Sequence, residues 1–112
     1  MLKWIRSYRN YSRHQDWLNT HFEGDYIRAR AGDSILTHIV DMLEGIGPDS
    51  AEFPRRATKA IAALTRPDAA WGKVVAFRDS HKTFDYEVPA RFITVEAVHQ
   101  QARYIREVRT SK

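Results

Sequence analysis

The feature that most limits the fold of this chain is a run of apolar residues at helical spacing near its middle. The run consists of Ile35, Leu36, Ile39, Val40, Leu43 and Ile46. Residues three and four apart share one face of an α-helix, so the run predicts an amphipathic helix. Asp33 or Ser34 can cap its first turn, and Gly45 to Pro48 ends it because proline cannot continue a helix.

Helices are also expected on both sides of this run. Large side chains recur at helical spacing at Trp4, Tyr8, Tyr11, Leu18 and Phe22. They predict a helix over residues 2–22, with a break near Ser12. Small apolar residues from Ala57 to Leu64 predict a third helix, ended by Arg66-Pro67-Asp68, and residues 99–108 predict a short C-terminal helix.

The hydrophobic period changes after residue 72. Three short segments, 73–77, 82–88 and 91–98, are rich in β-branched and aromatic residues and predict an antiparallel meander, with Ile93, Val95 and Ala97 as a core row. The expected fold is therefore α+β, with N-terminal helices followed by a three-stranded antiparallel sheet and a short C-terminal helix. We expect a single domain over residues 1–112, made of a helical N-terminal extension (1–33), a helical hairpin (34–66), the sheet (71–98) and a basic tail (99–112).

Positive charge is concentrated at the two ends of the chain, whose formal net charge is +4. The first 14 residues contain four bases and no acid, and residues 98–112 contain four bases and one acid, whereas acids outnumber bases between them. Such asymmetry indicates a polyanionic or acidic partner. We expect RNA, the ribosome or another nucleoprotein complex.

The composition excludes several classes of protein. The chain has no cysteine, which excludes disulfide scaffolds and thiolate metal sites, and its five histidines are too scattered for a metal centre. No nucleotide-binding loop or hydrolase motif occurs, and no apolar run reaches the length of a membrane span. We therefore expect a cytoplasmic protein with no metal, no cofactor and no membrane contact.

Three groups of residues are candidates for a site, and each has a structural alternative. Trp4, Tyr8 and Tyr11 can stack on bases while four basic residues neutralise phosphates, namely Lys3, Arg6, Arg9 and Arg13. Alternatively these aromatics pack in the core and the arginines stay solvated. His38 beside Asp41 is either a general base or a partly buried histidine.

The third group lies in the last third of the chain, which is rich in Lys, Arg, His and Tyr. Its members are Lys73, Arg78, His81, Lys82, Arg91, His99, Arg103 and Tyr104. A concave sheet edged by such groups can cut RNA without a metal, by proton transfer and stabilisation of the pentavalent phosphate. The alternative is that strand ends and turns simply carry polar residues.

The segment Tyr86–His99 with Ala102-Arg103-Tyr104 resembles the closing hairpin of the RelE/ParE toxin superfamily, and Leu64–Pro67 before Gly72-Lys73 is similar to the family's link from helix to sheet. The resemblance covers roughly residues 34–108. The family normally opens with a strand, whereas residues 1–33 here indicate helix, and Gln100 stands where the family has arginine.

This resemblance implies a small basic toxin that acts on RNA or the ribosome as a metal-independent endoribonuclease and is neutralised by an acidic antitoxin. It implies His99, Arg103 and Tyr104 as catalytic residues, and Lys73, Arg78 and Lys82 as phosphate-binding residues. Arg91, which has the strand parity of His99, is a further expected nucleic-acid-binding residue. A branch of the family that poisons gyrase needs none of them for chemistry. The alternative function is a non-catalytic phage or mobile-element protein that binds nucleic acid or a protein complex through its basic termini, so whether the chain is an enzyme stays open.

Overall fold

The computed structural model describes residues 3–69, 72–78 and 85–110. Its elements are α1 (Lys3–His21), α2 (Tyr26–Met42), α3 (Phe53–Leu64), β1 (Thr65–Ala69), β2 (Gly72–Arg78), β3 (Asp85–Pro89), the 3₁₀ turn η1 (Ala90–Phe92) and α4 (Val95–Thr110). The three strands form an antiparallel sheet in the order β1-β2-β3. This arrangement confirms the predicted α+β fold with helices first, then the sheet, then a C-terminal helix.

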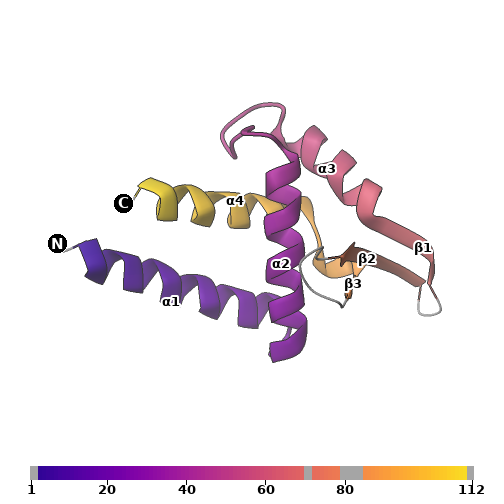
Figure 1. Cartoon of the computed structure of the whole chain (residues 1–112), viewed down its shortest axis with the longest axis horizontal. Coiled ribbons are helices and arrows are strands. Elements are labelled where there is room, and N and C mark those ends of the chain that lie inside the picture. Colours follow the sequence, from indigo (N-terminus) through magenta and orange to yellow (C-terminus); the bar gives the residue numbers. More distant parts are fainter. Residues whose placement is uncertain (1–2, 70–71, 79–84, 111–112) are drawn as a thin grey trace.

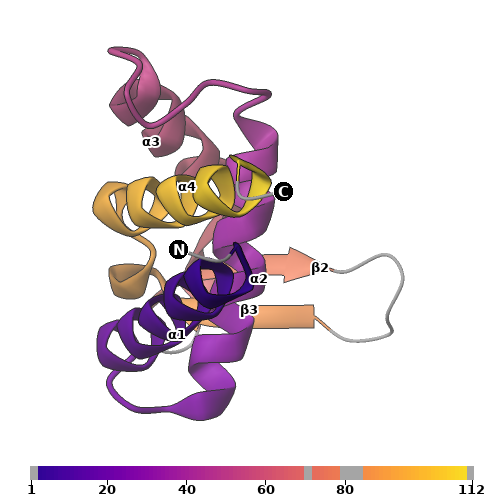
Figure 2. The ribbon, with the colours of Figure 1, turned by 90° about the vertical axis from the view of Figure 1, so that its left-hand side faces the viewer.

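Helix α2 lies at the centre of the molecule. Helices α1 and α4 run antiparallel, side by side, and project from one side of α2, whereas α3 and the sheet lie on its other side (Figure 1). Figure 2 looks onto the projecting pair, which we call the basic arm: the first half of α1 and the second half of α4. The core joins both sides, since fully buried Phe22, Ile39, Val75 and Val98 belong to one cluster.

Helices α1 and α2 differ from the sequence prediction. Helix α1 is continuous through Ser12. Helix α2 begins at Tyr26, before the start predicted near Ser34. The Asp25 carboxylate accepts a hydrogen bond from the Arg28 backbone N–H at 3.0 Å and so caps the first turn of α2. Asp33 is therefore an interior residue of α2 and not its cap, and the boundary predicted between residues 33 and 34 falls inside this helix.

Glycine 32 explains how the end of α1 approaches α2 so closely. A Cβ added at Gly32 would lie 2.1 Å from the Phe22 ring, which is completely buried. Glycine leaves room for that ring. The close contact anchors the C-terminal end of α1, while its N-terminal half extends beyond α2 (Figure 1).

The predicted strand over residues 91–98 is wrong. Residues 90–92 form η1 and α4 starts at Val95, with the Thr94 Oγ1 accepting a hydrogen bond from the Ala97 N–H at 3.1 Å. The predicted row of Ile93, Val95 and Ala97 is therefore not a strand face. The third strand is instead β1, which follows α3 directly where only a helix end was expected, and β2 and β3 overlap the other two predicted strands; residues 82–84 lie outside the described residues.

Candidate nucleic-acid interface

The predicted phosphate-binding residues of the last third are spread over the sheet and η1. Lys73 and Arg78 are exposed on β2 and Arg91 is exposed in η1, while Lys82 lies outside the described residues. Arg78 Nε donates to Asp85 at 2.9 Å, and Arg91 donates to Glu23 at 3.2 Å. Both guanidinium groups are thus already in ion pairs. The predicted strand that was to carry Arg91 and His99 does not form, because residues 90–92 are a 3₁₀ turn and α4 starts at Val95.

The three predicted catalytic residues all lie on α4, but His99 and Tyr104 face different neighbours. His99 Nε2 is 3.2 Å from the Pro48 carbonyl oxygen, and its ring meets Phe53 edge-on at 5.4 Å. Tyr104 instead stacks flat on the His14 ring of α1, with 3.7 Å between the centroids. The structure therefore brings Arg103 and Tyr104 to one groove and His99 to another part of the surface.

The two basic ends of the chain meet in the basic arm. Arg6, Arg9 and Arg13 are exposed on α1, and Arg13 faces Arg103 of α4 across a groove of about 160 Å³. The side chain of Lys3 lies outside the described residues. Because α1 and α4 are antiparallel, charges that are almost a whole chain apart in sequence act on the same region of solvent (Figure 1).

An exposed aromatic row runs along the same half of α1. Trp4, Tyr8 and Tyr11 are 69%, 69% and 55% exposed, whereas Leu18 and Phe22, further along the same series, are buried. The alternative that all these aromatics are core residues is thus wrong for the first three. The reason is tertiary: the N-terminal half of α1 projects past α2, and α4 packs on another face of α1, the one that carries His14 (Figure 2).

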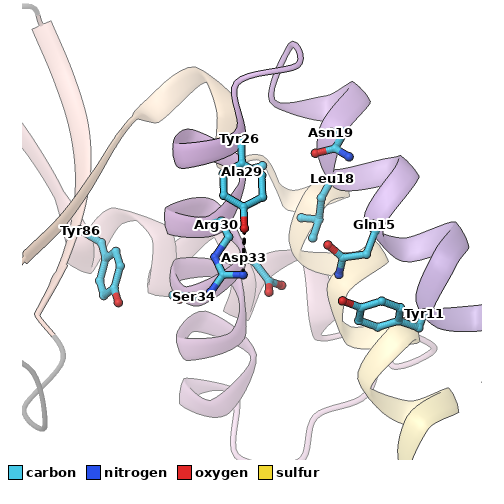
Figure 3. A pocket seen from close by; sticks show the side chains of 10 residues that line it. All are labelled: Tyr11, Gln15, Leu18, Asn19, Tyr26, Ala29, Arg30, Asp33, Ser34 and Tyr86. Carbon is cyan, nitrogen blue, oxygen red and sulfur yellow. Dashed lines mark hydrogen bonds between the residues drawn. The ribbon is translucent and has the colours of Figure 1, made fainter. Parts of the chain in front are cut away.

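The aromatic row leads to a pocket of about 250 Å³ over the outer face of α2 (Figure 3). Tyr11 and Gln15 of α1 stand on one side of it and Tyr86 of β3 on the other. The remaining lining residues are Leu18, Asn19, Tyr26, Ala29, Arg30, Asp33 and Ser34. The Arg30 guanidinium donates to the Tyr26 hydroxyl at 3.5 Å, so the pocket combines tyrosine rings, amides and one charge of each sign.

A buried polar cluster, formed by His14, Asp33, Thr37 and Gln101, supports the Asp33 side of this pocket. Gln101 Nε2 donates to Asp33 Oδ1 at 2.8 Å and to Thr37 Oγ1 at 2.9 Å, and His14 Nε2 lies 3.5 Å from the same Asp33 oxygen. His14 and Gln101 are buried, while the Asp33 side chain is 42% exposed toward solvent. The cluster ties α1, α2 and α4 together. The sequence does not indicate this cluster, because its members are far apart in the chain and the local pattern predicts Asp33 or Ser34 as a helix cap.

The contacts of the cluster change the pKa of Asp33, and the charge of Asp33 in turn contributes to the pKa of Tyr104. Burial alone would raise the pKa of Asp33, but contacts from His14 and Gln101, with the charge of Arg30, hold that pKa below its usual value. Burial raises the pKa of the Tyr104 phenol, and the negative charge of Asp33 raises it further. At neutral pH Asp33 is therefore a fixed carboxylate, and Tyr104 stays a neutral phenol that is poorly suited to act as a base.

His38, the candidate general base, is half-buried and stacks on Phe77 at 4.4 Å, whereas Asp41 is exposed. Among the described residues, no three His, Asp or Glu side chains gather closely enough to hold a metal ion. Within the same part of the chain, no helix combines the length and apolarity needed to cross a membrane. Comparison with protein-family models, curated proteins and solved structures gave no match.

Proposed function

We propose that this protein binds single-stranded nucleic acid, with RNA as the expected form, through the aromatic row and arginines of the basic arm. The observation that carries the proposal is the exposure of Trp4, Tyr8 and Tyr11 at helical spacing on a helix that also carries Arg6, Arg9 and Arg13. Large aromatic side chains that remain uncovered in a row are suited to stacking on unpaired bases.

The aromatic and arginine rows follow different sides of α1, yet they act on the same strand. An α-helix with its side chains is about 10–12 Å across. The Debye length at physiological ionic strength is about 8 Å, so attraction across the whole width of the helix is largely screened. The arginines therefore act on those phosphates that their long side chains reach from the flanks of α1. Arg103, across the groove from Arg13, extends this positive field onto α4.

The arrangement favours binding over catalysis. The catalytic set implied by the family resemblance is divided between two surfaces, and Tyr104 is held in a stack with His14. A toxin that cuts RNA or acts on the ribosome, with an acidic antitoxin as its partner, stays a prediction from the sequence. The proposed function needs only exposed rings and unpaired guanidinium groups.

The test is fluorescence anisotropy with a labelled twelve-nucleotide uridine oligomer and the double variant W4A/Y8A. Base stacking contributes about 1–3 kcal/mol per aromatic residue, so each substitution should weaken binding at least about fivefold. Ile27→Ala is the matched control, because Ile27 is 79% exposed and lies on α2 away from the aromatic row. Equal affinities for the wild type and W4A/Y8A would contradict the proposal. Electrophoresis of the same RNA after incubation reports any cleavage.

A further inference from the structure

We propose that the pocket over α2 receives one unpaired guanine of the bound strand, and that Asp33 accepts hydrogen bonds from the edge of this base. The inference rests on the proposed function and adds a base preference to it. It is carried by three features of the pocket: its position at the end of the aromatic row, its size, and its pattern of donors and acceptors.

The position of the pocket makes it continuous with the aromatic row. Tyr11 is both the last exposed residue of the row and a wall of the pocket, and Gln15 follows it one helical turn later. A strand whose bases stack on Trp4, Tyr8 and Tyr11 therefore arrives at the pocket without changing direction. Figure 3 shows Tyr11 and Gln15 along α1, with the opening between them and α2.

The size of the pocket suits a single base. Its volume of about 250 Å³ lies just below the roughly 300–1,000 Å³ of pockets that take drug-sized ligands. A planar base fits such a space, while its sugar and phosphate remain outside toward the basic arm. Tyr26 and Tyr86, on different sides of the pocket, offer rings against which the base can pack (Figure 3).

The polar groups of the pocket match guanine. Guanine presents two neighbouring donors, N1–H and the N2 amino group, beside the O6 acceptor. The Asp33 carboxylate can only accept, and Arg30, one helical turn earlier on the same pocket wall, can only donate. Adenine and cytosine place a ring-nitrogen acceptor beside their amino group, which would face the carboxylate unfavourably, and uracil has one donor between two acceptors.

The buried polar cluster fixes the acceptor in advance. Gln101 and His14 approach Asp33 Oδ1 from the protein side, and no hydrogen bond among the described residues engages Oδ2. The contacts with Gln101 and His14 thus orient the carboxylate, while the Asp33 side chain is still 42% exposed to solvent. A cationic side chain is a poorer occupant than a neutral base, because it would meet the positive charge of Arg30 in the same pocket.

The experiment compares the wild-type protein on four labelled uridine oligomers that carry guanosine, inosine, adenosine or cytidine at one central position. We expect the guanosine oligomer to bind about tenfold tighter than the adenosine and cytidine oligomers. Inosine lacks the N2 amino group, so the affinity of the inosine oligomer should lie between that of the guanosine oligomer and those of the adenosine and cytidine oligomers. Asp33→Asn should abolish the preference. Asp16→Asn should keep it, since Asp16 is an exposed carboxylate of α1 and its loss changes the net charge equally.

A second variant guards against a folding defect in Asp33→Asn, whose partner Gln101 is buried. Tyr26→Ala removes a 68% exposed ring from the pocket wall and should reduce the guanosine preference while the protein still folds. Equal binding of all four oligomers, with W4A/Y8A still weakened, would overturn the guanine pocket and leave the proposed function intact. A guanosine preference that survives both Asp33→Asn and Tyr26→Ala would also overturn it. Failure to bind any oligomer would overturn both proposals.

Discussion

Replacing the three arginines of α1 by glutamine should change the salt dependence of RNA binding by a calculable amount. Five arginines are exposed on the two helices of the basic arm without an ion-pair partner among the described residues: Arg6, Arg9, Arg13, Arg103 and Arg109. The logarithm of the association constant falls with the logarithm of the salt concentration, with a slope of about −0.7 for each phosphate neutralised on a single strand. Five arginine–phosphate contacts therefore give a slope of about −3.5. Affinity should then fall about 100-fold between 50 and 200 mM salt.

The variant R6Q/R9Q/R13Q retains two of the five arginines, so its slope should drop to about −1.4 and its affinity should fall only about sevenfold over the same range. Fluorescence anisotropy at four salt concentrations measures both slopes. The matched control, R55Q/K59Q/K73Q, removes the same charge from exposed positions on α3 and β2, on the other side of α2. An unchanged slope in the α1 variant, or an equal drop in the control, would refute the assignment of the binding surface to α1.

Three further predictions concern the framework of the site. Gly32→Ala should lower the free energy of unfolding by about 1–3 kcal/mol in urea titrations, because its Cβ would clash with the Phe22 ring, whereas Gly47→Ala, which meets open space, should be nearly neutral. Asp25→Ala should cost about 1 kcal/mol in the same assay through loss of the α2 cap. The folded-state pKa of Asp33 is lowered, so its contribution to stability is present above the ordinary pKa of 3.8 and is lost as pH falls below it. Asp33→Asn should flatten this acid part of the stability profile, and a profile as steep as in the wild type would contradict the assigned contacts.

The sequence was sufficient to predict elements whose burial follows from local periodicity. The apolar spacing from Ile35 to Leu43 predicts the buried face of α2, and the alternation around Val88 predicts β3. Residues 91–98 are a segment for which local periodicity gives the wrong secondary structure. Their β-branched side chains favour a strand, but Thr94 can equally cap a helix that buries Ala97 and Val98, and tertiary packing decides between the two.

The candidate site depended even more on tertiary structure. The spacing of Trp4, Tyr8 and Tyr11 indicates one helix face, but only the overhang of α1 beyond α2 leaves this face exposed. Asp33 and Gln101 are separated by 68 positions, and no local pattern indicates that they meet. Residue spacing likewise gives no indication that Tyr104 stacks on His14, which comes from the other end of the chain.

The pairing of α1 with α4 also sets an order of events during synthesis. Residues 22–94 separate the two helices, and at a translation rate of about 5–20 residues per second α1 waits roughly 4–15 s for its partner. During that interval the face that α4 will cover, including His14, is open to solvent. The N-terminal helix is thus made first but reaches its final contacts late, so a nascent chain interrupted before α4 would present an unpaired basic helix.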